Sequence, residues 1–181
     1  IMAELVQQRY AGAFYEVAKE LQKEDAFLEE LKFIDKVLTD NSDFMKVLKA
    51  PMISKEEKKS LIEKVFANQL STSTFNFLKI LVDKSRVAAF PQIADEFKNL
   101  LNAARNIKEV TAITASPLSE DLKAALIEKL QAITGSEIVL NHLVDSSLIG
   151  GILIKIGNEQ IDGSVKSRLE GLKQDISAII A

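Results

Sequence analysis

Few residues of this 181-residue chain have the type and spacing that chemistry requires. His142 is the only imidazole and there is no cysteine, which excludes a two-histidine metal site, a thiolate nucleophile, a Cys-ligated zinc and an iron–sulfur cluster. The acidic pairs Glu29-Glu30 and Glu56-Glu57 are adjacent on expected helices, so their side chains diverge, which favours a solvated face over an acid–base couple. We therefore expect no catalytic residues, no metal and no cofactor.

Lys155 follows the paired glycines Gly150-Gly151, which invites comparison with a phosphate-binding loop. The required G-x-x-x-x-G-K-[ST] pattern is absent, and the lysine falls inside an expected strand instead of at a helix start. A small hydrolase or transferase with its site near Gly150-Gly151 and Asp162 stays as an alternative. It would need a nucleophile and a base that converge, and this stretch offers only Ser, Asp and Lys.

The composition is that of a folded protein, with 47% apolar and 27% charged residues. No apolar run approaches the roughly 20 residues that span a bilayer, and no apolar segment follows a basic start, so we expect a soluble, unexported chain. The net charge of −3 lies entirely after residue 105, because the earlier part is charge-balanced. Neither part carries the clustered basic surface that nucleic-acid binding needs.

Two kinds of periodicity divide the chain near residue 105. Before it, apolar residues recur every three or four positions and predict six helices, over 5–22, 26–39, 44–48, 55–66, 74–84 and 91–106. Ser54 and Glu57 have the spacing of a capping box at the fourth helix. After it, residues 110–115 alternate as a strand does, 120–134 form a helix that Gly135 ends, and 138–144 with 151–156 are expected to pair as a hairpin. A last helix is expected over 164–180, with Ser164 as its N-cap.

The predicted fold is therefore mainly α: a six-helix bundle over residues 2–105, followed by a small α+β domain over residues 106–181.

The first and fifth helices have unusually wide apolar arcs. On a helical wheel these arcs cover roughly 200° and 220°, about twice what a helix on the outside of a bundle needs. Either both helices are central and bury this width internally, or part of each arc lines a groove that binds a partner's amphipathic helix. Asn76, beside the second arc, is either a surface residue or a hydrogen-bonding partner that sets register. The arcs comprise Val6, Tyr10, Ala11, Ala13, Phe14, Tyr15, Val17, Ala18 and Leu21, and Phe75, Phe77, Leu78, Ile80, Leu81 and Val82.

The second part carries a long and specific pattern. It resembles the C-terminal signature of the delta subunit of F-type ATP synthases, called the oligomycin-sensitivity-conferring protein in mitochondria. The start is similar too, since Arg9-Tyr10-Ala11-Gly12-Ala13-Phe14 resembles the family's opening R-Y-A-x-A-[LF], and Asp83-Lys84-Ser85-Arg86 resembles its end of the fifth helix. The signature consists of Ile138, Leu140, Val144-Asp145, Leu148, Gly150-Gly151, Ile152, Ile154-Lys155, Gly157 and the run Ile161-Asp162-Gly163-Ser164-Val165-Lys166-Ser167-Arg168-Leu169.

The resemblance implies that the first and fifth helices bind the N-terminal helix of an ATP synthase alpha subunit at the top of the catalytic head. It also implies that residues 107–181 contact the b or b-prime subunits of the peripheral stalk, with Lys166, Arg168 and Lys173 either facing stalk acids or solvated. The signature residues Asp145, Gly150, Gly151, Lys155, Gly157, Asp162 and Gly163 are then structural. The implied head-binding residues are Tyr10, Ala13, Phe14, Val17, Asn76, Lys79, Ile80 and Asp83.

The implied task is mechanical: a stator that keeps the head from turning with the central shaft, so that proton flow is coupled to ATP synthesis. Such a subunit would be peripheral to the membrane on the head side, at the cytoplasmic face of a bacterial inner membrane or its thylakoid or mitochondrial counterpart. A free-standing adaptor with a helix-binding groove stays as an alternative. It would bind unrelated amphipathic peptides equally well.

Overall fold

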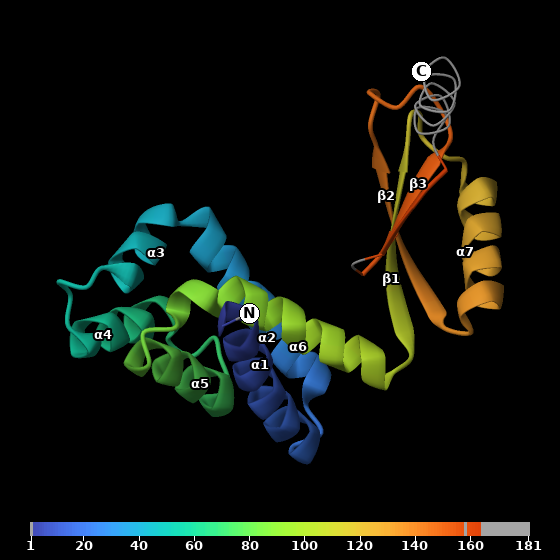
Figure 1. The fold of residues 1–181 in the computed structure, drawn as a ribbon. Helices are drawn as coiled ribbons and strands as arrows, with labels where there is room; N and C mark the ends of the chain where they lie inside the picture. The colour runs from blue at the N-terminus through green and yellow to red at the C-terminus, as the bar shows by residue number, and fades with distance from the viewer. Residues whose placement is uncertain (1, 158, 164–181) are drawn as a thin grey trace. The chain divides into compact units, whose positions relative to one another are not determined.

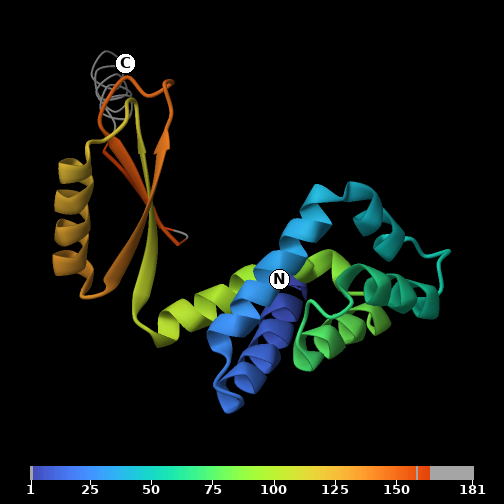
Figure 2. The ribbon, with the colours of Figure 1, turned by 180° about the vertical axis from the view of Figure 1, so that it is seen from behind.

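The chain forms two compact units, residues 1–101 and 102–181, and each is considered by itself. The computed structural model describes residues 2–157 and 159–163, and Figures 1 and 2 show the same ribbon from opposite sides. The predicted last helix over 164–180, with its N-cap Ser164, lies outside the described residues.

Helices make up the first unit. Six α-helices and one short 3-10 helix precede the first strand, which matches the predicted number of α-helices and their order. They are α1 (Met2–Glu20), α2 (Glu24–Asp40), α3 (Ser42–Lys49), α4 (Lys55–Phe66), α5 (Thr72–Asp83), η1 (Val87–Ala89) and α6 (Phe90–Ala104).

The predicted capping box starts α4. The Ser54 hydroxyl accepts from the Glu57 N–H at 3.2 Å, and the Glu57 carboxylate accepts from the Ser54 N–H at 3.0 Å. The hydrogen bond that the Ser54 hydroxyl donates to the Glu57 carboxylate at 2.8 Å, together with the bond from the Ser54 N–H, lowers the pKa of Glu57. The local sequence therefore fixes where α4 begins.

One apolar core joins the helices of the first unit. Its centre is aromatic: the ring of Phe14 on α1 stacks on Phe27 of α2 and on Phe77 of α5, with centroid distances of 4.9 and 4.2 Å. Phe97 of α6 lies 5.6 Å from the same ring in a tilted orientation. Four helices thus meet at one side chain of α1.

The described residues of the second unit, up to Gly163, form one helix and a four-stranded sheet in the order β2-β1-β3-β4. Its elements are β1 (Ile107–Thr114), α7 (Glu120–Thr134), β2 (Glu137–Val144), β3 (Ile152–Ile156) and β4 (Glu159–Asp162). β2 runs parallel to β1, while β3 is antiparallel to β1 and to β4.

The hairpin predicted between 138–144 and 151–156 is wrong, because β1 lies between these two strands. A parallel pair needs a crossover, and α7 supplies it between β1 and β2. The chain then turns at Asp145, whose N–H donates to the Thr114 carbonyl at 2.9 Å at the end of β1, and continues to the other edge of that strand.

α7 covers one face of the sheet. Val110, Leu130 and Ile138 form the buried centre of this second core, and Leu140 and Ile154 pack around them. Because alternate residues of a strand point to opposite faces, Val139 and Leu143 point away from α7, and both are exposed.

No helix among the described residues is long and apolar enough to cross a membrane.

Candidate partner-binding face

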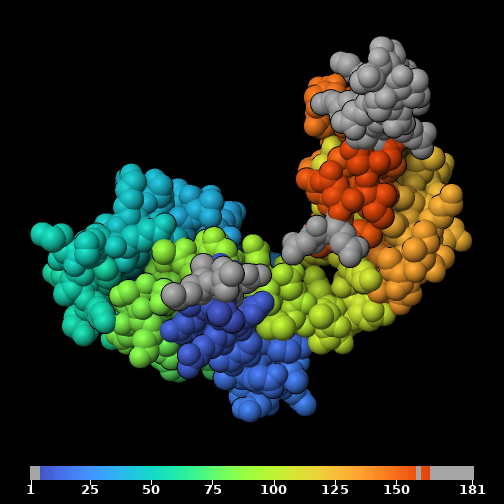
Figure 3. Space-filling model, viewed as in Figure 1, coloured from blue at the N-terminus to red at the C-terminus, as the bar shows by residue number. Residues whose placement is uncertain are grey.

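The wide apolar arc of α1 is only half covered by its own unit. Ala11, Phe14, Tyr15 and Ala18 are buried, with Tyr15 packed edge-on against Phe97 of α6. The other half of the arc is open: Ala13 is exposed, Val17 and Leu21 keep 40% and 47% of their surface, and Tyr10 is half-buried at the edge of the core. Figure 3 shows α1, in dark blue, at the surface of the first unit.

The arc of α5 is divided in the same way. Phe77, Leu78, Leu81 and Val82 are buried in the core, whereas Ile80 keeps 47% of its surface. Asn76, one turn before Ile80, is exposed. α5 therefore also presents a strip that no neighbouring helix covers.

Each open strip lies beside one of two rings that stack on each other. Phe14 stacks on Phe77 where α1 meets α5. Tyr10 and Val17 lie within about 60° of Phe14 around α1, Leu21 directly follows the end of that helix, and Ile80 lies about 60° from Phe77 around α5. The half-buried Tyr10 and the exposed Ala13, Val17, Leu21, Asn76 and Ile80 are together called the α1–α5 face below.

Phe14 is expected from the resemblance to contact a partner helix, but the structure places it in the core. Only 4% of its surface is exposed, and its ring is enclosed by three other aromatic rings. Its position on the wheel is at the border of the buried half, where a large ring fills the gap between α1 and α5. In this structure Phe14 packs in the core beneath the α1–α5 face.

Lys79 and Asp83 are paired with α4. The Lys79 ammonium lies 2.6 Å from the Glu63 carboxylate and 4.5 Å from the centre of the Phe75 ring, and the Asp83 carboxylate lies 2.6 Å from the Lys59 ammonium. This hydrogen bond to Asp83 raises the pKa of Lys59. Among the expected contact residues, these two thus lie on the side of α5 that packs against α4.

The glycines of the C-terminal signature form the turns around β3. Gly151 and Gly157, which precede and follow that strand, have φ of 82° and 57°, a region that favours glycine. A Cβ on Gly163 would meet the Ile152 carbonyl oxygen at 3.1 Å. Gly150 is half-buried in the turn before β3. These glycines therefore have structural reasons for their positions.

The charged signature residues lie in a turn and in the β3–β4 pair. Asp145 accepts from the Ser147 N–H at 2.9 Å within a turn. Lys155 pairs with Gln160 across β3 and β4, and Asp162 pairs with Leu153. Their pairing explains the pattern as strand and turn structure.

The only histidine is part of a local hydrogen-bond chain. The Thr114 hydroxyl donates to the Ser116 carbonyl at 2.7 Å, so at its 2.7 Å contact with His142 it accepts a hydrogen bond from the ring Nε2–H. Within residues 2–157 and 159–163, no group of three or more His, Asp or Glu side chains could hold a metal ion.

Comparisons with known proteins agree over nearly the whole chain. The model of the family described as ATP synthase delta (OSCP) subunit matches residues 6–176. ATP synthase subunit delta of Clostridioides difficile (strain 630) is 39% identical over 181 residues, which cover 99% of this chain and 100% of that protein. ATP synthase subunit delta of Alkaliphilus metalliredigens (strain QYMF) is 40% identical over 179 residues, or 99% of each chain.

The fold is also found in a solved assembly. A chain in the cryo-EM structure of the Toxoplasma gondii mitochondrial ATP synthase hexamer superposes with a TM-score of 0.72, over 94% of this chain and 96% of that one, at 24% identity. At this identity the likeness describes the fold alone.

Proposed function

This chain belongs to the family of ATP synthase delta (OSCP) subunits, and from that premise we propose that it links the catalytic head to the b subunit of the peripheral stalk. The delta subunit is a structural, non-catalytic component of the stator. Its role is to resist the torque that would otherwise turn the head with the central shaft. Proton flow then drives ATP synthesis instead of idle rotation.

The observation that carries the proposal is the α1–α5 face. Val17, Leu21 and Ile80 expose apolar surface on both sides of the Phe14–Phe77 contact, which suits the apolar stripe of an incoming helix. Fully burying an exposed side chain of this kind contributes about 1.5–3 kcal/mol, and these three, which keep 40–47% of their surface, would each contribute somewhat less than half of that toward the cost of ordering a partner segment. The N-terminal helix of the alpha subunit is the proposed occupant.

The second unit is the proposed contact for the b or b-prime subunits. Its sheet is covered by α7 on one face, while Val139 and Leu143 are exposed on the other. An amphipathic stalk helix could cover this second face. The assembled subunit would then lie at the periphery of the membrane on the head side, at the cytoplasmic face in a bacterium.

Titration calorimetry with the full chain tests the head contact. A peptide matching the N-terminal helix of the alpha subunit of the same ATP synthase should bind with micromolar or better affinity. Ile80→Glu and Asn76→Glu should each weaken binding at least tenfold, or about 1.4 kcal/mol, because both place a charge against the apolar stripe.

Met52→Glu is the matched control. Met52 is 94% exposed in the loop between α3 and α4, so a charge there should leave the affinity unchanged. Equal affinity of wild type and both face variants would reject the assignment of this face. Equal affinity for unrelated amphipathic peptides would favour the free-standing adaptor instead.

A further inference from the structure

α5 lacks the charges that usually match a helix dipole. A helix carries a partial positive charge at its N-terminus and a partial negative charge at its C-terminus. α4 meets this need with Glu56 and Glu57 in its first turn and Lys64 in its last. α5 has no acidic residue in its first turn and no basic residue in its last turn, although it carries half of the α1–α5 face.

At the N-terminus of α5 the missing negative charge comes from α2. The Glu30 carboxylate accepts from the Ser71 N–H and from the Ser71 hydroxyl, each at 2.8 Å, and also from the Thr74 hydroxyl. Thr74 is fully buried, and Glu30 and Ser71 are half-buried. Ser71 is also the N-cap of α5, since its hydroxyl accepts from the Thr74 N–H at 3.3 Å. A carboxylate 41 residues away in sequence thus completes this cap.

At the C-terminus of α5 the positive charge comes from α4. The Lys55 ammonium donates to the Asp83 carbonyl oxygen at 2.6 Å, one of the carbonyls that the helix itself leaves without a partner. Lys59 binds the Asp83 carboxylate, also at 2.6 Å. These lysines lie on the first and second turns of α4.

We infer that Glu30 of α2 and the pair Lys55 and Lys59 of α4 act as positioning residues that fix α5 at its two ends by charges opposite to its dipole. One consequence rests on the proposed function: the part of α5 that carries Asn76 and Ile80 is held in place before the alpha subunit binds. A preorganised face loses less conformational freedom on binding. Glu30 is the stronger end, because it accepts three hydrogen bonds in a half-buried place, whereas Lys55 is exposed and Lys59 pairs with an Asp83 side chain that is 43% exposed, so that this ion pair is screened by salt.

The contacts of Glu30, Lys55 and Lys59 with the two ends of α5 are called the clamp below. Amide hydrogen exchange on the full chain tests the clamp without any partner. Glu30→Ala should speed exchange in α5 at least tenfold while α6 changes less than twofold. Glu30→Gln, which keeps one acceptor oxygen, should give an intermediate increase. Lys55→Met combined with Lys59→Met should speed exchange only in the last turn of α5, and 1 M NaCl should mimic this second effect in the wild type but not the first.

Glu29→Gln is the matched control, because Glu29 precedes Glu30 on α2 and pairs with Lys32 on the exposed surface. It should leave exchange in α5 unchanged. Unchanged exchange in α5 after Glu30→Ala and Glu30→Gln would overturn the inference, and so would an equal increase in α1, α2, α5 and α6, which would mean a general loss of stability. If the Glu30→Ala variant does not fold, the exchange rates of α5 in the Glu30→Gln and Glu29→Gln variants are compared, and equal rates would overturn the inference.

The alpha-subunit peptide separates this inference from the proposed function. Glu30→Gln should weaken peptide binding three- to tenfold, although Glu30 does not belong to the α1–α5 face. If the wild type does not bind the peptide, the proposed head contact fails while the exchange result still decides the clamp. If Glu30→Gln speeds exchange in α5 and leaves the affinity unchanged, the clamp stands and its effect on docking is refuted.

Discussion

Replacing Phe14 distinguishes a core residue from a contact residue most sharply. Its ring is 96% buried and lies 4.9, 4.2 and 5.6 Å from the rings of Phe27, Phe77 and Phe97. A buried Phe→Ala change costs about 3–5 kcal/mol, and aromatic pairs are worth about 0.5–1.5 kcal/mol each beyond area, so we expect a loss near 4 kcal/mol. With a urea m-value of about 1.5 kcal/mol per molar, the unfolding midpoint should fall by roughly 2–3 M.

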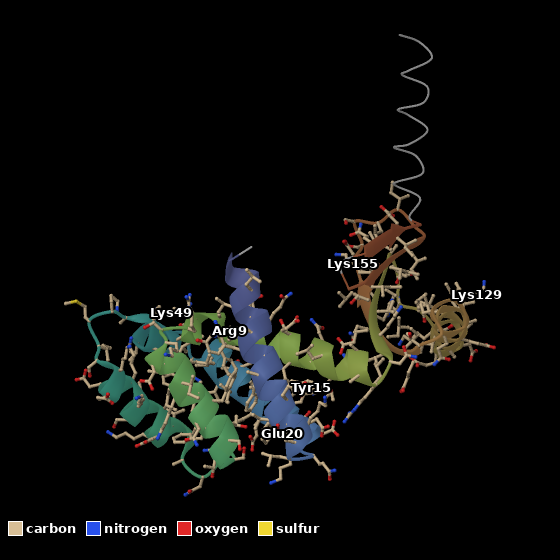
Figure 4. The ribbon with its side chains drawn as sticks, turned by 60° about the horizontal axis from the view of Figure 1, so that its bottom comes forward. Arg9, Tyr15, Glu20, Lys49, Lys129 and Lys155 are labelled. Carbon is tan, nitrogen blue, oxygen red and sulfur yellow. The ribbon has the colours of Figure 1, made fainter. Side chains whose placement is uncertain are left out.

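Tyrosine fluorescence follows this transition in the first unit alone. The chain has no tryptophan and two tyrosines, Tyr10 and Tyr15, and both lie on α1. Tyr15, labelled in Figure 4, packs with its ring centroid 5.6 Å from that of Phe97. Unfolding of the second unit therefore leaves this signal unchanged, and the midpoint belongs to the helical core.

Two further variants fix the interpretation. Phe14→Leu keeps most of the apolar volume and should cost less than about 1.5 kcal/mol. Val17→Ala, one turn further along α1 and 40% exposed, should stay within about 0.5 kcal/mol of the wild type. A loss below about 1 kcal/mol for Phe14→Ala would show that the ring is not a core element. It would refute the placement of Phe14 in the core beneath the α1–α5 face.

Two other sites give predictions of opposite sign. Burial, with Asp95 nearby, raises the pKa of Asp35, whose Oδ1 is buried without a hydrogen-bond partner. The folded state then holds the proton more tightly, so stability falls as pH rises through this raised pKa. Asp35→Asn should stabilise the protein slightly at pH 7, with a gain that disappears in acid, as urea unfolding at several pH values would show; a gain independent of pH would contradict this. Gly135→Ala should cost about 1 kcal/mol by the same measurement, because Gly135 ends α7 at φ 64°; a neutral result would contradict this explanation, since space for a Cβ is present.

Local signals in the sequence were sufficient to place two helix ends. Ser54 and Glu57 predicted the start of α4, and Gly135 predicted the end of α7, because each depends on atoms a few residues apart. Strand pairing depends on distant residues instead. The β-rich composition of 138–144 identified it as a strand, but nothing in that composition distinguishes pairing with 151–156 from pairing with β1.

The candidate face was predictable in its breadth but not in its borders. A wheel gives the width of the apolar arc of α1, while the packing of Phe27, Phe77 and Phe97 decides that Phe14 is covered and Val17 is not. In the same way, the wheel places Lys79 and Asp83 on the polar side of α5. Only the arrangement of the helices shows that Glu63 and Lys59 of α4 take them as partners.

The central position of β1 has a consequence for synthesis on the ribosome. β1 pairs with β2 on one side as soon as α7 has folded back, but its other edge is completed by β3, which is translated last of the three. A polypeptide released before residue 152 would keep a row of unpaired N–H and C=O groups along 110–114, the residues of β1 that β3 pairs with. Such an edge pairs readily with the same edge of another molecule. Truncated products of this gene should therefore aggregate, and the nascent chain depends on completing translation promptly to avoid it.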